Sequence, residues 1–286
     1  MVESTIEELI KSCNPKNSNE AKEILREILQ KIVLIGLSKK DFFKYASFYG
    51  GTALRLFYDL NRFSEDLDFT LNKKNNDFSL IIYKDSIKEV ANSYGLDIDI
   101  DIKDKIVSTN IESAFAKLNT YQTFINFKIN RNILNLIHKD ELIKVKFEVD
   151  KDPSLGFNYE LKWIDVPEYA SVSVLDLPSL LSGKIHAILC RTYKNNVKGR
   201  DYYDFLFYMR KRVKPNMKYL MNKLIESKVI KEDDDFDINI LKEMLIKKFE
   251  NVDFNMIKED IKKFLVNNEN VDFYSKELFI DVVKRL

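Results

Sequence analysis

Two aspartates, Asp66 and Asp68, lie one residue apart in the stretch SEDLDFTL. From Ser64 onward apolar and polar residues alternate, which predicts a β-strand with one apolar and one polar face. Side chains two residues apart on a strand point to the same side, roughly 6 to 7 Å apart at the backbone. Because hard cations such as Mg²⁺ prefer oxygen ligands and keep positions open for phosphate oxygens, the pair predicts a metal site.

A glycine pair precedes these aspartates. Gly50 and Gly51, two of the seven glycines in the chain, stand before TALRLFYDL, whose apolar spacing is helical and whose Thr52 is a plausible N-cap. Free backbone N–H groups at a helix N-terminus can bind phosphate. The stretch LDIDIDIK at 96–103 has the same alternation and more acids, but it lacks this turn and the neighbouring Arg62 and Ser64.

The composition indicates a globular protein with no overall charge. The 286 residues are 45% apolar and 12% aromatic, and 46 basic against 45 acidic residues leave a formal charge of +1. Any site for a polyanion must therefore come from local clustering. Only nine of the basic residues are arginines, which makes the position of each arginine informative.

Cysteine usage and hydropathy set the expected location. Cys13 and Cys190 are far apart and have no zinc-ligand spacing, and no stretch resembles a signal peptide or a membrane span. We expect a reduced, cytoplasmic protein that does not associate with a membrane.

The periodicity predicts an α+β fold followed by helices. Helices are expected at 20–36 and through KKDFFKYA, and strands at 96–103, 121–130, 143–150 and around YELKWIDV. These elements fit a mixed or antiparallel sheet with helices on one side. Helices are expected at 176–191, 200–212, 216–227, 238–250, 255–267 and 275–285, with a loop at 231–237. We predict domains at 1–170 and 171–286.

The string GGTALRLFYDLNRFSEDLDF resembles the first motif of the AbiEii/AbiGii nucleotidyltransferase toxin family, a branch of the polymerase-β-like nucleotidyltransferases. In that family a Gly-Gly or Gly-Ser turn precedes an acidic pair. The resemblance extends from about residue 20 to about residue 210 and implies an α/β nucleotidyltransferase domain followed by a helical domain that completes the active-site cleft.

The resemblance also implies a third carboxylate on a neighbouring strand, and VKFEVD supplies two candidates. Lys146, Glu148 and Asp150 share one face of that strand. The family often has K-x-E here, which favours Glu148, whereas metal-binding nucleotidyltransferases in general leave Asp150 open.

Lys184 lies in the middle of the apolar stripe of the helix that Asp176 is expected to cap. A lysine there is costly unless its ammonium meets an anion, which is either a structural carboxylate or a substrate phosphate. The family places a lysine in this helix, and the resemblance implies that it contacts the triphosphate.

The segment KGRDYYDF resembles the last family motif, RDxxD after a basic turn. Asp201 and Asp204 lie on one face of a helix start, and the resemblance implies a catalytic or site-organising acid at one of them. Arg200 is a candidate for gripping phosphate or an RNA backbone. Two aromatic-basic patches, RTYK at 191–194 and YMRKRVK at 208–214, are candidates for clamping single-stranded RNA ends.

The resemblance implies Mg²⁺-dependent nucleotidyl transfer. Mg²⁺ would be held by Asp66 and Asp68, and the NTP by the glycine turn with Thr52, Arg62, Ser64 and Lys184. It further implies a toxin of a toxin–antitoxin or abortive-infection (phage-defence) pair that modifies RNA, expected to be the tRNA 3′ end, with a separately encoded antitoxin as partner. Two alternatives stay open, namely a nucleotidyltransferase that modifies a partner protein, and a non-enzymatic nucleotide-binding module.

Overall fold

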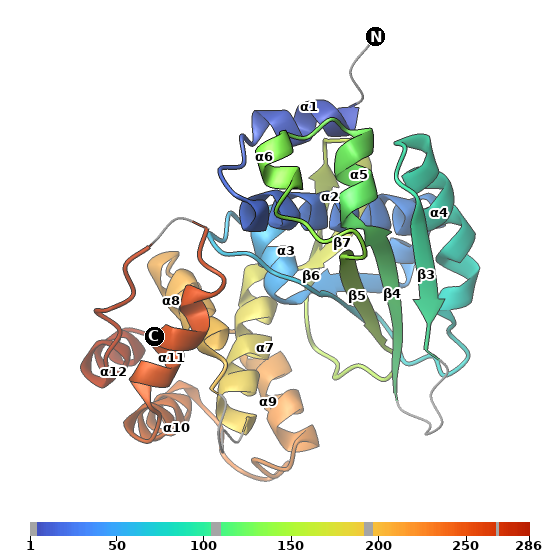
Figure 1. The fold of residues 1–286 in the computed structure, drawn as a ribbon. Helices are drawn as coiled ribbons and strands as arrows, with labels where there is room; N and C mark the ends of the chain where they lie inside the picture. Colours follow the sequence, from blue (N-terminus) through green and yellow to red (C-terminus); the bar gives the residue numbers. More distant parts are fainter. Residues whose placement is uncertain (1–4, 104–109, 192–196, 267–268) are drawn as a thin grey trace. The chain divides into compact units, whose positions relative to one another are not determined.

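The computed structural model describes residues 5–103, 110–191, 197–266 and 269–286 (Figure 1). The chain divides into two compact units. The sheet unit comprises Met1–Phe48, Glu65–Pro153 and Leu161–Val174, and the helical unit comprises Tyr49–Ser64, Ser154–Glu160 and Leu175–Leu286. The division differs from the predicted boundary at 170, because residues 49–64 and 154–160 group with the C-terminal helices.

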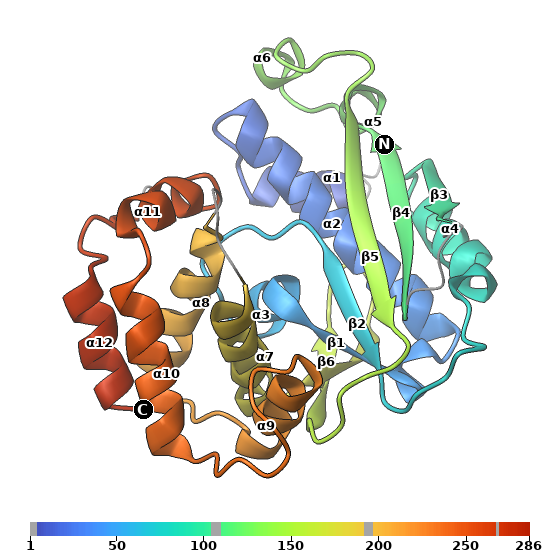
Figure 2. The same ribbon diagram turned by 90° about the horizontal axis from the view of Figure 1, so that it is seen from below.

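A seven-stranded mixed sheet confirms the predicted α+β class (Figure 2). Its strand order is β3-β4-β5-β2-β1-β7-β6. The β3/β4 and β4/β5 pairs are antiparallel, whereas β2/β5 and β1/β7 are parallel. The strands are β1 (Ala46–Tyr49), β2 (Leu67–Leu71), β3 (Ile98–Ile102), β4 (Ile111–Asn119), β5 (Leu142–Asp150), β6 (Tyr159–Ile164) and β7 (Ala170–Leu175).

Helices α2 (Ser18–Lys39) and α4 (Lys84–Ser93) pack on each other and on the sheet through β5 and β3 (Figure 2). The α2 segment from Ile32 to Leu37 is buried on every side, as expected of a helix inside a core. Gly36 permits the crossing, since a Cβ there would lie 2.5 Å from the Ile87 Cα. The other helices of this unit are α1 (Thr5–Ser12), α5 (Thr120–Asn126) and α6 (Arg131–Leu134).

Two predicted elements of the sheet unit were wrong. The helix expected through KKDFFKYA is a single 3₁₀ turn, Phe42–Lys44, followed by β1, because Asp41 takes a left-handed φ of 59° that ends the helical path. The strand expected at 121–130 is helix α5 instead. Asn119 caps that helix by accepting from the Gln122 N–H at 2.8 Å, so the strand ends there.

In the helical unit, all six predicted C-terminal helices are confirmed. They are α7 (Leu177–Cys190), α8 (Gly199–Arg210), α9 (Met217–Glu226), α10 (Ile238–Glu250), α11 (Phe254–Lys262) and α12 (Lys276–Lys284), and α3 (Gly50–Phe57) belongs to the same unit. Aromatic side chains pack between α8, α10 and α12. The ring centroids of Phe205 and Phe249 lie 5.6 Å apart, and those of Phe249 and Phe279 lie 5.2 Å apart. None of the described helices has both the length and the apolar character needed to span a membrane.

Candidate active site

Strand register in the sheet unit brings two of the predicted carboxylates together. In the parallel pair β2/β5, Asp68 is the partner of Glu148 and Thr70 is the partner of Asp150. Asp66 is exposed and directly precedes β2, and Asp68 is half-buried. Since register partners on adjacent strands project to the same face, Glu148 lies beside Asp68, whereas Asp150 lies one side-chain row further along.

Glu148 is held in place by two neighbours. The buried Ser113 hydroxyl on β4 donates to Glu148 Oε1 at 2.7 Å, and Lys146 Nζ lies 2.7 Å from Oε2. Ser113 is the register partner of Glu148 on the other side, so Ser113, Glu148 and Asp68 form a row across three strands. Ser113 was not predicted from the sequence. The strand at 143–150, which is β5, was expected, but β4, which contains Ser113, was not.

The donor chemistry of this row fits a hard divalent cation. Among the described residues no group of three or more His, Cys, Asp or Glu side chains is arranged to hold a metal ion. Mg²⁺ usually binds through one or two carboxylates together with substrate phosphates, so a pair of carboxylates is a sufficient protein contribution. Asp66 and Asp68, with Glu148 beside Asp68, supply oxygen donors of that kind.

The register predicts unequal roles for the two β5 acids. We expect Glu148→Gln to reduce nucleotidyl transfer by about a hundredfold or more, because it removes negative charge next to Asp68, and Asp150→Asn to reduce it less than tenfold. Initial rates of transfer for the two variants provide the measurement. Equal losses would contradict the assignment of Glu148 over Asp150.

The glycine turn lies in the helical unit, at the start of α3. Gly50 has a φ of 86°, a left-handed value that favours glycine, and the N-cap residue of α3 is Tyr49. Thr52 is therefore not the N-cap, contrary to the prediction; it lies inside the first helical turn and is buried. The turn does open a helix N-terminus, where N–H groups can face an anion.

Gly51 is required by the close approach of Arg62. A Cβ at Gly51 would lie 2.4 Å from Arg62 Nη2 and 3.0 Å from the Ser64 hydroxyl oxygen. Arg62 cannot move aside easily, because its Nη2 donates to Asp204 Oδ2 at 2.7 Å. The guanidinium thus packs against the glycine turn, and the second glycine is explained by this contact.

Gly51→Ala is accordingly expected to displace Arg62 and to destabilise the helical unit by a few kcal/mol, as overpacking of a filled core does. Gly183→Ala on α7 is the matched control, because a Cβ there meets nothing within 4 Å. In the helix interior it should be neutral or stabilising by about 0.5 to 1 kcal/mol. Urea unfolding of both variants measures the difference, and a Gly51→Ala protein as stable as wild type would argue against the contact.

A buried ion-pair network occupies the helical unit, and we define it as Arg62, Lys184, Arg191, Asp201 and Asp204. The Arg62 guanidinium is 2% exposed and binds Asp204 through Nε and Nη2, each at 2.7 Å. Lys184 Nζ lies 2.8 Å from both Asp201 Oδ1 and Asp204 Oδ2. Of the two kinds of anion expected for Lys184, a structural carboxylate or a substrate phosphate, the structure shows structural carboxylates, those of Asp201 and Asp204.

Three elements position this network. Helix α7, capped by Asp176, which accepts from the Ser179 N–H at 2.9 Å as predicted, carries Lys184. Helix α8 carries both aspartates, and the segment after α3 carries Arg62. Phe63 N–H donates to the Phe264 carbonyl at 2.8 Å, which fastens that segment within the helical unit.

The two predicted phosphate-binding arginines have local partners. Arg62 is a buried member of the network, and Arg200 lies with its guanidinium carbon 3.9 Å from the centroid of the Phe264 ring. Arg191 Nη1 donates to Asp201 Oδ2 at the edge of the network, and its side chain is partly exposed. The rest of the predicted RTYK patch, 192–194, lies outside the described residues.

Electrostatics keep the buried members of the network, Lys184 and Asp204 among them, ionised near neutral pH. Burial lowers the pKa of Lys184, but the charges of Asp201 and Asp204 outweigh it and raise that pKa overall. Burial raises the pKa of Asp204, yet Arg62 and Lys184 hold it below its usual range. Lys184 is therefore a cation and Asp204 an anion near neutral pH.

The same charges predict an acid-sensitive helical unit. Burial raises the pKa of Asp201, but Lys184 and Arg191 lower it to about 2. A lowered folded-state pKa contributes stability that is complete above the unfolded value near 4 and is lost as the pH falls towards about 2. The contribution is about 2 kcal/mol.

Arg191→Ala should raise the pKa of Asp201 and shift the loss of stability to higher pH, whereas Arg131→Ala, on the exposed α6 start, should not. Unfolding by urea at successive pH values tests this, and identical acid profiles would contradict it.

The predicted site residues divide into two sets, one in each unit. The sheet unit contains the predicted metal ligands, Asp66, Asp68, Glu148 and Asp150. The helical unit contains the predicted phosphate-binding and organising residues: Gly50, Gly51, Thr52, Arg62, Ser64, Lys184, Arg200, Asp201 and Asp204.

Comparison with known proteins identifies one matching family. The family model described as nucleotidyl transferase AbiEii toxin, type IV TA system, matches residues 32–276. JHP933 from Helicobacter pylori has a similar solved structure, with a TM-score of 0.50, 19% identity and coverage of 91% of this chain and 88% of that chain. MenT4, the nucleotidyltransferase toxin Rv2826c from Mycobacterium tuberculosis H37Rv, gives a TM-score of 0.48 and 16% identity over 98% and 87% of the two chains. No curated protein matches the sequence. The likeness to JHP933 supports the fold.

Proposed function

We propose that this chain, which belongs to the AbiEii family of nucleotidyltransferase toxins of type IV toxin–antitoxin systems, transfers a nucleoside monophosphate from an NTP to RNA, with the tRNA 3′ end as the acceptor. The observation that carries the proposal is the row of carboxylates in the sheet unit, in which Asp68 has Glu148 as its register partner and Asp66 precedes it by two residues.

The sheet unit supplies the acidic groups. Asp66 and Asp68 would hold a divalent cation such as Mg²⁺, which lowers the negative charge on the α-phosphate when bound. Glu148 adds negative charge beside Asp68, and Ser113 and Lys146 fix its orientation. Their role is electrostatic and positional, as expected for transfer of a phosphoryl-type group.

The helical unit supplies the phosphate-binding groups. The N–H groups at the Gly50-Gly51 turn, at the start of α3, would bind the phosphates, and the Ser64 hydroxyl lies close to the same turn. Arg62 and Lys184, predicted as triphosphate ligands, are engaged by Asp204 and Asp201. We assign them a positioning role, in which Arg62 supports the glycine turn and Asp204 holds both cations.

The reaction balances without an oxidant or reductant. An acceptor hydroxyl oxygen attacks the α-phosphorus, and the bond from the α-phosphorus to the bridging oxygen breaks. Pyrophosphate leaves with that electron pair, and the hydroxyl proton passes to solvent. Blocking the tRNA 3′ end in this way would stop translation, and a separately encoded antitoxin would be needed to protect the cell.

The experiment is incubation of the purified protein with Mg²⁺, each α-³²P-labelled NTP in turn and total tRNA, resolved on a denaturing gel. Label on RNA that is absent with Asp66→Ala supports the proposal and names the base. Label on protein would instead favour the protein-modifying alternative, and no label in any lane would favour a binding module. Replacing Mg²⁺ with chelator should abolish labelling.

A further inference from the structure

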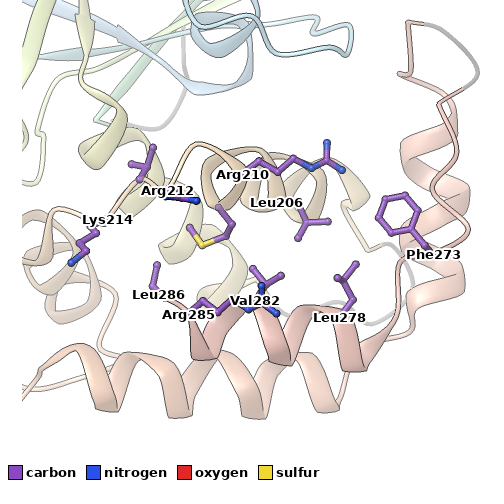
Figure 3. Close-up of a pocket in the computed structure, with 11 residues that line it drawn as sticks. Leu206, Arg210, Arg212, Lys214, Phe273, Leu278, Val282, Arg285 and Leu286 are labelled. Atoms are coloured by element: carbon purple, nitrogen blue, oxygen red, sulfur yellow. The ribbon is translucent and has the colours of Figure 1, made fainter.

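A cavity of about 590 Å³ lies in the helical unit between the C-terminal end of α8 and helix α12 (Figure 3). Its volume falls within the range of small-molecule sites. The candidate active-site residues do not line it, so it is separate from the glycine turn and the ion-pair network.

The interior of this cavity is apolar. Leu206 on α8 and Leu278 and Val282 on α12 point towards one another across it (Figure 3). Met209 and Val213 complete this surface. Such an interior can bind an apolar group, but its side chains would not stabilise a bare anion.

The rim of the same cavity is cationic. Arg210, Arg212, Lys214 and Arg285 line it, so three of the nine arginines of the chain surround one cavity. All four side chains belong to exposed residues. In a protein of net charge +1, this is a local concentration of the groups that bind phosphate best.

Two of these cations have weak or exposed partners and two have none among the described residues. Arg210 Nη1 lies 3.7 Å from Glu269 Oε1, and the Arg285 guanidinium pairs with the Asp281 carboxylate one helical turn away. Arg212 and Lys214 side chains make no hydrogen bond or ion pair within the described part of the chain. Surface pairs of this kind contribute little, so the rim can exchange them for an anionic ligand at small cost.

An aromatic ring lies at one end of the lining. Phe273 is 50% exposed and lies at the opposite end from Lys214 (Figure 3). An exposed phenylalanine ring is a surface on which a nucleobase can stack. The cavity therefore combines an aromatic face, an apolar interior and a guanidinium rim.

We propose that this cavity is an RNA-anchoring site, in which one unstacked base enters the apolar interior against Phe273 and the flanking phosphates bind Arg212, Lys214 and their neighbours. The inference rests on the proposed function, since the RNA acceptor supplies the ligand. An acidic protein segment would match the rim, but a stacked base also uses the aromatic face and the apolar interior, which favours RNA.

Binding, not catalysis, is the test. Fluorescence anisotropy of a labelled single-stranded RNA of about eight nucleotides is measured with the full chain carrying Asp66→Ala and without NTP. Arg212→Ala/Lys214→Ala should weaken binding and lower the slope of log K against log salt by about 1.4, as loss of two single-strand phosphate contacts requires. Arg131→Ala/Lys139→Ala, which removes the same charges from exposed positions in the sheet unit, is the matched control and should change neither.

The base contact is tested separately with Phe273→Ala. This variant should bind the RNA about tenfold more weakly and an oligomer of the same length with abasic sugars as tightly as the parent does. A variant that loses affinity for both ligands equally, or for neither, overturns the stacking contact.

The outcomes separate this site from the proposed function. Unchanged RNA affinity and salt slope in Arg212→Ala/Lys214→Ala overturn the site even if the wild-type protein labels tRNA. A loss in that variant with no labelling of RNA by the wild type keeps the site and refutes the transfer reaction. Displacement of the RNA by a glutamate-rich amphipathic peptide at lower concentration than by unlabelled RNA overturns it in favour of a protein ligand.

Discussion

Asp68→Asn is expected to lower nucleotidyl transfer by about a thousandfold or more while leaving the protein folded. The substitution keeps the size of the side chain and removes the negative charge beside Glu148, on which a divalent cation would depend. Metal stabilisation of transition-state charge is worth several kcal/mol, and each 1.4 kcal/mol is a factor of ten in rate. Asp68 is half-buried on β2, so little packing is lost.

The chain contains a matched control for this experiment. Asp99 and Asp101 on β3 have the same spacing as Asp66 and Asp68, but each pairs with a lysine, Lys88 or Lys117. Asp101→Asn should therefore leave transfer within about twofold of wild type, since it breaks only a surface ion pair.

Initial rates at saturating NTP, together with circular dichroism to verify folding, provide the measurement. A folded Asp68→Asn protein with wild-type turnover would refute the metal assignment. Equal losses of transfer activity in Asp68→Asn and Asp101→Asn would show that carboxylate charge anywhere on the sheet affects transfer, and that the row of Asp68 and Glu148 has no special role.

Periodicity predicted the elements whose burial pattern is regular. The strand at 143–150 is β5, and each C-terminal helix lies where its apolar spacing places it. The two wrong elements arose where a local cap or a left-handed residue overrode the pattern, at Asn119 and Asp41. Neither effect is visible in apolar spacing, because each depends on one side chain or one φ value.

The site was predictable as residue types but not as contacts. The sequence indicated that Lys184 needed an anion, either a structural carboxylate or a substrate phosphate, and the structure shows two carboxylate partners, Asp201 and Asp204. It left Glu148 and Asp150 as alternatives, because register between β2 and β5 depends on a pairing across about 80 residues of chain that no local pattern encodes. The burial of Arg62 was also not predicted, since a charged residue in a loop gives no signal of its partner.

The strongest stability effect is expected from Asp204→Ala. The substitution leaves the Arg62 guanidinium buried without its bidentate partner and removes one of the two carboxylates that Lys184 contacts. Breaking a buried pair by removing one member typically costs about 3 to 5 kcal/mol. Hydrogen exchange of the α8 amides measures this loss within the helical unit itself.

A double replacement separates stability from function. Arg62→Met/Asp204→Leu substitutes apolar groups for both buried charges, and such exchanges are often neutral for stability. Lys184 keeps Asp201 as its partner in this variant. We expect protection of the α8 amides to return while transfer stays low, because the contact of Arg62 with the Gly50-Gly51 turn is lost. Recovery of both properties would mean that the network only holds the fold. If neither amide protection nor transfer recovers, the bidentate Arg62–Asp204 ion pair itself, and not merely apolar side chains of similar size, is needed to hold α8 in place.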